Sequence, residues 1–151
     1  MTDGIRDDVA TTTDALPLTG GCRCGAIRYE IAALPDFAVS CHCRACQYDS
    51  GGGPAHAIVV APAALSIRQG EPKRFEYPSA TSGEMVFRSF CPDCGTPLFG
   101  GSSGADYISV KAGSLDDPEN FRPRAQIWTA SAPSWHPVEP DIPSFTGNME
   151  L

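Results

Sequence analysis

The sequence predicts an all-β fold, mainly antiparallel, in a single domain. Gly and Pro supply 15 and 14 of the 151 residues, which favours short strands and turns over long helices. The apolar fraction of 42% and the charged fraction of 19% exclude wholesale disorder. A chain of this length buries about 68–70% of its extended surface in one core, so it suits one domain rather than two.

The expected strands are short and follow one another between turns. In residues 25–31, Ile27, Tyr29 and Ile31 alternate with polar residues, which is typical of a half-buried strand. Further strands are expected at residues 37–41, 55–60, 65–68, 74–77, 85–90, 107–111 and 125–129. Two helical turns are expected, one after Cys43 and one over residues 115–119, where Asp and Pro suit a first turn. No period of 20–50 residues recurs, so a repeat array is excluded.

The chain divides into three segments by composition. Residues 1–15 hold four aspartates against one arginine and are expected to form a disordered acidic tail. This segment has no apolar run and no basic start, so a cytoplasmic location is expected. The predicted domain covers residues 16–131. Residues 132–151 are Pro-rich and are expected to pack on or near the domain through Trp135, Ile142 and Phe145.

The net charge and the lack of a long apolar run exclude two classes of partner. A formal net charge of −7 has the wrong sign for a protein that binds phosphate backbones, so no nucleic-acid partner is expected. No apolar run approaches the ~18 residues that a membrane span requires, so no membrane partner is expected either.

The seven cysteines carry the strongest chemical signal: Cys22, Cys24, Cys41, Cys43, Cys46, Cys91 and Cys94. An odd number of cysteines without a secretory signal argues against a disulfide framework. Cysteines two apart on a strand are also poorly placed to bridge each other. Metal binding, thiol chemistry, or both remain.

Counting the clusters predicts which cysteines share a metal ion. The clusters hold two, three and two cysteines, and a closed tetrahedral site needs four ligands. If each cluster acts as a unit, only the two pairs add up to four, which joins Cys22 and Cys24 to Cys91 and Cys94. We call these residues the four-cysteine cluster. Gly95 permits the positive-φ exit that a Cys-x-x-Cys turn needs. The alternative is two buried thiol pairs without metal.

Cys41, Cys43 and Cys46 form the remaining group, which we call the three-cysteine cluster. Three ligands and an open fourth position are typical of catalytic zinc. Three thiolates favour a soft fourth ligand such as a substrate thiol, and Arg44 or Arg23 could offset the added charge. Two alternatives stay open. One of the histidines at positions 42, 56 and 136 could close the site, or the thiols could form a metal-free redox cluster.

Four segments resemble the glutathione-dependent formaldehyde-activating enzyme family, which includes centromere protein V-like members. They are GGCRCGAIRYE at 20–30, CHCRACQ at 41–47, FCPDCGTPLF at 90–99 and VKAGSLDDPENF at 110–121. The resemblance implies a β-tent fold, with two antiparallel sheets meeting near a zinc site. It also implies a structural zinc on the four-cysteine cluster and a second site on the three-cysteine cluster. The implied activity adds glutathione to formaldehyde to give S-(hydroxymethyl)glutathione, the reverse of a carbon–sulfur lyase reaction.

Three functions from different classes are therefore considered. The favoured one is a zinc-dependent enzyme that adds a glutathione-like thiol to formaldehyde or a related small aldehyde at the three-cysteine cluster. The alternative is a non-catalytic, zinc-stabilised protein-binding module, and a zinc-ribbon nucleic-acid binder is disfavoured by the charge. No catalytic residue is assigned, with Arg44 as the one candidate and Asp49 as the nearest carboxylate. Candidate contacts for glutathione are Arg23, Arg44, Arg88, Lys111, Tyr48, Trp128 and Trp135.

Overall fold

A computed structural model describes residues 16–149, and within them the chain is mostly antiparallel β-structure, as predicted. The predicted acidic tail at residues 1–15 lies outside the described residues. No helix in the described part of the chain has both the length and the apolar character needed to cross a membrane.

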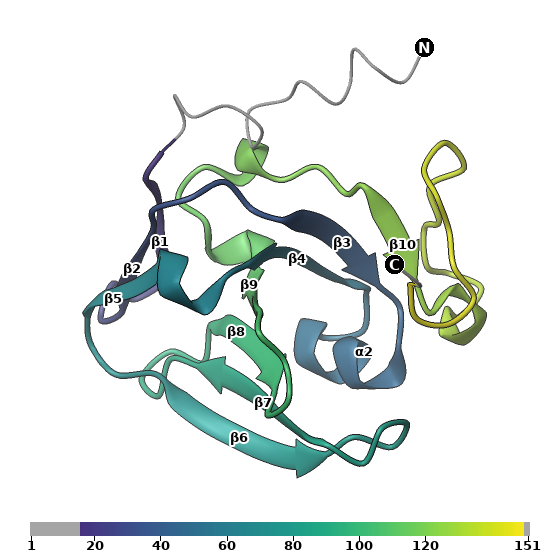
Figure 1. Cartoon of the computed structure of the whole chain (residues 1–151), viewed down its shortest axis with the longest axis horizontal. Coiled ribbons are helices and arrows are strands. Elements are labelled where there is room, and N and C mark those ends of the chain that lie inside the picture. The colour runs from purple at the N-terminus through teal and green to yellow at the C-terminus, as the bar shows by residue number, and fades with distance from the viewer. Residues whose placement is uncertain (1–15, 150–151) are drawn as a thin grey trace.

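The described strands form two sheets (Figure 1). The smaller has the order β1-β2-β5, built from Leu18–Gly21, Arg28–Ile31 and Leu65–Gln69. The larger has the order β10-β3-β4-β9-β8-β7-β6. Its strands are β3 (Phe37–Cys41), β4 (Ala55–Val60), β6 (Lys73–Pro78), β7 (Met85–Phe90), β8 (Pro97–Ser102), β9 (Ile108–Lys111) and β10 (Ala125–Ile127). Neighbours run antiparallel except β10 and β3, which are parallel.

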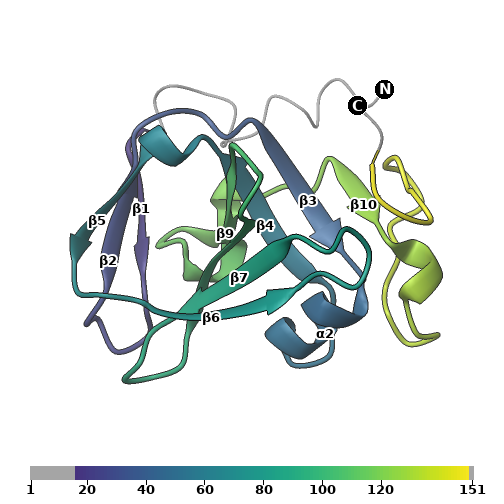
Figure 2. The same ribbon diagram turned by 60° about the horizontal axis from the view of Figure 1, so that its bottom comes forward.

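The helical segments are short. Helix α2 spans Arg44–Ser50, and the 3₁₀ turns η3, η4, η5 and η6 span Pro62–Ala64, Ala112–Ser114, Pro118–Asn120 and Thr129–Ser131. Figure 2 shows α2 beneath the large sheet, between β3 and β6. This position brings α2 near strands that are distant in the sequence.

Two strands were not expected from the sequence. Strand β1 ends in Gly20-Gly21, and β8 contains Gly100-Gly101, so neither shows an alternation of apolar side chains. The glycines are required by close packing, since a Cβ at Gly20 would lie 2.3 Å from the Tyr29 hydroxyl. The strand expected from residue 25 begins at Arg28 instead, because a turn closed by the bond from Cys22 N–H to Ile27 C=O precedes it.

The core joins the two sheets. Tyr29 of the small sheet packs edge-on against Phe99 of the large sheet, with ring centroids 5.2 Å apart. The Tyr29 hydroxyl also lies 2.7 Å from the Ser114 hydroxyl. The other large, fully buried apolar side chains are Leu18, Ile27, Ile31, Ile58, Leu98, Val60 and Val110.

The segment after η6 runs beside β10 at the edge of the large sheet. Gln126 N–H donates to Pro143 C=O, and Phe145 N–H donates back to Gln126 C=O, each over 2.9 Å. The buried Gln126 side chain donates to Glu139 C=O and accepts from Glu139 N–H. Of the aromatic contacts expected here, Trp135 is 67% exposed, whereas Phe145 is half-buried.

Candidate metal centres and an adjoining cavity

The structure brings the four-cysteine cluster together from two turns. One turn follows β1 and the other links β7 to β8, and all four sulfurs lie within 4.8 Å of one another. Gly95 adopts a φ of 77° and donates its N–H to Cys91 C=O over 2.8 Å, which closes the second turn. The Ile27 N–H points at the Cys22 sulfur, 3.2 Å away.

The spacing of these sulfurs fits a tetrahedral metal ion. The Cys22 and Cys24 sulfurs lie 3.5 Å apart, and those of Cys24 and Cys91 lie 3.8 Å apart. Tetrahedral zinc with bonds of about 2.3 Å to sulfur requires separations of about 3.8 Å. Hydrogen bonds from the side chain and backbone of Thr96 lower the pKa of Cys94 to about 5, which favours the thiolate that a metal needs. The four-cysteine cluster could therefore hold one ion with a closed ligand set.

The three-cysteine cluster forms where β3 turns into α2. Cys41 ends β3, Cys43 caps α2, and Cys46 lies in the first turn of the helix, with the three sulfurs within 4.8 Å of one another. The Cys46 N–H donates to the Cys43 sulfur over 3.4 Å. The expected helical turn after Cys43 thus folds the third thiol back onto the other two.

The three thiols share hydrogen bonds that favour a single thiolate at Cys43. Hydrogen bonds from Cys41 and then Cys46 lower the pKa of Cys43 to about 2. The same hydrogen bonds to Cys43 and Cys46, together with burial, raise the pKa of Cys41. A hydrogen bond with Cys41 opposes the shift at Cys46, but the hydrogen bond to Cys43 and burial raise the pKa of Cys46 to about 11. A divalent ion would replace the remaining thiol protons.

Within the described residues, the three-cysteine cluster has no fourth protein ligand. The buried His42 ring faces His136 instead, with their Nδ1 atoms 2.9 Å apart. His136 Nε2 lies 2.6 Å from Gly52 C=O, and His56 Nδ1 lies 2.7 Å from the Ser40 hydroxyl. None of these three histidines joins the group of sulfurs, so a tetrahedral ion would keep one open position.

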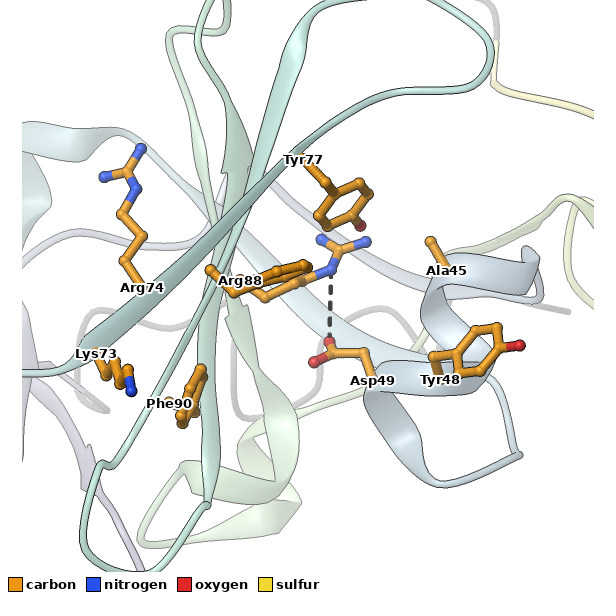
Figure 3. A pocket seen from close by; sticks show the side chains of 9 residues that line it. Ala45, Tyr48, Asp49, Lys73, Arg74, Tyr77, Arg88 and Phe90 are labelled. Carbon is orange, nitrogen blue, oxygen red and sulfur yellow. Dashed lines mark ion pairs between the residues drawn. The ribbon is translucent and has the colours of Figure 1, made fainter.

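A cavity of about 730 Å³ lies beside the three-cysteine cluster, between α2 and strands β6 and β7. Its lining residues are Ala45, Tyr48, Asp49, Lys73, Arg74, Phe75, Tyr77, Arg88 and Phe90. Figure 3 shows Arg88 extending from β7 toward Asp49 on α2, with Tyr77 close to the guanidinium. The cavity thus combines aromatic walls with charged side chains.

Arg88 connects the cavity to the three-cysteine cluster. Its Nη2 donates to the Cys46 sulfur over 3.9 Å, and its Nε lies 3.8 Å from Asp49 Oδ2. Lys111 of β9 also pairs with Asp49, and these three side chains are 12–18% exposed. Burial opposes the charge on Arg88, but electrostatic interactions with Cys46, Tyr77 and Asp49 raise its pKa above the usual value.

The structure separates the other residues expected at the site. Arg44 donates to the Gln47 side chain and lies over the Tyr48 ring, 4.8 Å from its centroid. Arg23 lies at the four-cysteine cluster, where its N–H donates to the Thr96 hydroxyl over 3.0 Å. Trp128 and Trp135 are not among the residues that line the cavity, whereas Tyr48 is.

Sequence reasoning missed the wall formed by β6. Lys73, Phe75 and Tyr77 alternate along this strand, and they line the cavity together with Arg74. The alternation was visible, but nothing in the sequence shows that β6 faces α2, about two dozen residues earlier in the chain.

Comparisons with known proteins agree with this architecture. A family model described as glutathione-dependent formaldehyde-activating enzyme matches residues 17–131. A crystal structure of a Rhodobacter sphaeroides protein from a structural genomics programme is similar, with a TM-score of 0.55 and 18% sequence identity. The match covers 84% of this chain and 98% of that one, and it shows a shared fold.

Proposed function

This chain belongs to the glutathione-dependent formaldehyde-activating enzyme family, and on that premise we propose that it adds a glutathione-like thiol to formaldehyde or a related small aldehyde. With glutathione and formaldehyde the product is S-(hydroxymethyl)glutathione, and the reverse reaction is that of a carbon–sulfur lyase. The observation that carries the proposal is the three-cysteine cluster, which has three ligands and a neighbouring cavity that Arg88 connects to it.

We assign zinc to both cysteine clusters. The four-cysteine cluster would hold a structural ion, because its ligand set is complete. The three-cysteine cluster would hold the second ion through Cys41, Cys43 and Cys46. Zinc bound to three thiolates supplies a soft open position that favours the thiolate form of an incoming thiol. Seven free cysteines also suit a reducing compartment, so we propose that the protein works in the cytoplasm.

The cavity suits a peptide-like thiol in size and chemistry. Its volume of about 730 Å³ lies within the range of about 300–1,000 Å³ that is usual for small-molecule sites. Phe75, Tyr77 and Phe90 supply apolar walls, and Lys73, on the same face of β6 as Phe75 and Tyr77, supplies positive charge for a carboxylate of a glutathione-like ligand. Arg88 lies nearest the cluster, so the ligand's sulfur is expected at that end.

The reaction needs no oxidant or reductant. The sulfur–carbon bond forms as the carbonyl π bond opens, and the thiol proton ends on the former carbonyl oxygen. The chain's contribution is to orient the thiol, favour its ionised form and bring the aldehyde beside it. The accessible cavity beside the cluster favours this enzyme over the protein-binding module considered from the sequence.

The test must allow for the spontaneous addition of thiols to formaldehyde. Exchange between glutathione and its formaldehyde adduct can be measured by two-dimensional NMR exchange spectroscopy with zinc-loaded protein. Wild-type protein and an Arg68→Met control should accelerate exchange, because Arg68 pairs with Glu30 on the small sheet. Cys43→Ser should lose the acceleration. Exchange no faster than in buffer, or equal rates for wild type and Cys43→Ser, would overturn the proposal.

A further inference from the structure

We propose that Arg88 binds the sulfur of the incoming thiol in its anionic form, and that Asp49 and Lys111 position it for this task. The inference rests on the proposed function and deepens it. It assigns the ligand's sulfur, rather than its carboxylates, to a cavity cation that also contacts the three-cysteine cluster.

Arg88 lies between the cavity and the three-cysteine cluster and contacts both. Its guanidinium lines the cavity and, at the same time, donates to the Cys46 sulfur over 3.9 Å. A thiol held against this guanidinium from the cavity would therefore lie at the end of the cavity next to the cluster. Arg44, the cation expected from the sequence, is occupied by Gln47 and Tyr48.

The net charge of the metal-loaded cluster and that of its neighbouring side chains have opposite signs. A divalent ion on three thiolates leaves one net negative charge, and an incoming thiolate adds another. Asp49 with two paired cations, Arg88 and Lys111, leaves one net positive charge beside the cluster. These side chains are largely buried, so the positive charge is poorly screened by water and acts strongly over short distances.

The hydrogen bonding of the Arg88 guanidinium is incomplete. Its Nε is buried without a hydrogen bond, since the 3.8 Å separation from Asp49 Oδ2 is an ion pair but too long for a hydrogen bond. A buried ion pair with incomplete hydrogen bonding stabilises a fold poorly. The arrangement orients Arg88 without using up its donors, which suits a residue that must accept another anion.

The cavity offers another cation for the carboxylates. Lys73 comes from β6, whereas the neighbouring Arg74 lies over the Phe87 ring, pairs with Glu76 and extends away from Arg88 in Figure 3. The positive groups therefore lie at different ends of the cavity, with Arg88 next to the cluster. Asp49 and Lys111 act through Arg88: Asp49 pairs with both cations, and Lys111 is not among the lining residues.

Binding of three probes to zinc-loaded protein, measured by calorimetry, tests the assignment. The probes are glutathione, 2-mercaptoethanol, which has a thiol without carboxylates, and S-methylglutathione, which has carboxylates without a thiol. Arg88→Met should weaken both thiols by the same factor, roughly ten- to a hundredfold for the loss of a charged hydrogen bond, and leave S-methylglutathione unchanged. Weakened binding of S-methylglutathione with unchanged 2-mercaptoethanol would overturn the assignment, because Arg88 would then bind a carboxylate.

Control variants separate this role from a general loss of structure. Arg68→Met removes an arginine paired on the small sheet and should leave the affinity for all three probes unchanged. Arg88→Lys keeps the charge and should restore part of the thiol affinity, which a merely structural role would not predict. If wild-type protein binds neither thiol, the proposed function itself fails. If wild-type protein binds both and Arg88→Met binds them equally well, only the role of Arg88 fails.

Cobalt(II)-loaded protein tests the positioning residues by a spectroscopic signature. Thiol binding near cobalt changes the sulfur-to-cobalt charge-transfer absorbance, so the midpoint of a 2-mercaptoethanol titration reports on the cluster directly. Asp49→Asn and Lys111→Met should each move this midpoint to higher thiol concentration, by less than Arg88→Met does. A midpoint equal to that of wild type in both variants would overturn their role.

Discussion

Gly100 lies directly opposite Arg88 in the β7–β8 ladder, and its lack of a side chain makes room for the Arg88 guanidinium. A Cβ at Gly100 would lie 2.8 Å from Arg88 Nη1 and 3.0 Å from the Ser109 hydroxyl. The backbone of Gly100 does not require a glycine, because its φ is not positive. The space occupied by the Arg88 guanidinium does require one.

Gly100→Ala should displace the guanidinium while keeping its charge. We expect weaker binding of 2-mercaptoethanol to zinc-loaded protein, by about threefold to tenfold, because a charged hydrogen bond is distorted rather than removed. Calorimetric titration measures the effect. Gly113→Ala is the matched control, since a Cβ there meets nothing within 4 Å. Equal affinities for wild type and Gly100→Ala would contradict the role given to this glycine.

The grouping of the cysteines could be predicted from the sequence because metal geometry constrains it. A tetrahedral ion needs four ligands, and spacings of two or three residues place thiols on one turn or one strand face. The structure brings Cys22 and Cys24 to Cys91 and Cys94, and leaves Cys41, Cys43 and Cys46 together.

The cavity could not be predicted in the same way. Arg88 and Lys111 were named from the sequence, but only as cations among several, and Asp49 only as the nearest carboxylate. Their assembly depends on the strand order β9-β8-β7-β6 and on the place of α2 beneath it. Strand order is set by long-range pairing, which local residue patterns do not specify.

The buried pair of His42 and His136 should stabilise the fold. The two Nδ1 atoms lie 2.9 Å apart, and His42 is fully buried. His136→Ala leaves the His42 Nδ1 without a partner, so the free energy of unfolding should fall by about 1–3 kcal/mol. Urea unfolding of the zinc-loaded protein measures this change. Val138→Ala, at a site that is 45% exposed, should change it little, and an equal loss in both variants would contradict the assignment.

The ion pair of Asp116 with Arg28 should make a small, pH-dependent contribution to stability. Hydrogen bonds from Arg28 and Thr19 hold the pKa of Asp116 below its ordinary value of 3.8. A lowered pKa in the folded state means that the stabilisation is full above about pH 4 and is lost as the pH falls through the folded-state value.

Asp116→Asn should therefore lower the free energy of unfolding at pH 7 by at most about 1 kcal/mol, since the side chains are 37% and 45% exposed. The difference from wild type should vanish well below pH 4. Urea unfolding at several pH values measures it, and metal loss in acid affects both proteins alike. The exposed Asp141→Asn is the control. A difference that persists in acid would show that the side chain acts by packing.

Metal bound at both cysteine clusters is the central requirement of the proposed function. Elemental analysis of protein purified without chelator measures zinc per chain. We predict two zinc ions per chain for wild type and one for Cys43→Ser, because this substitution removes a ligand from the three-cysteine cluster alone. One ion or none in the wild-type protein would contradict the account.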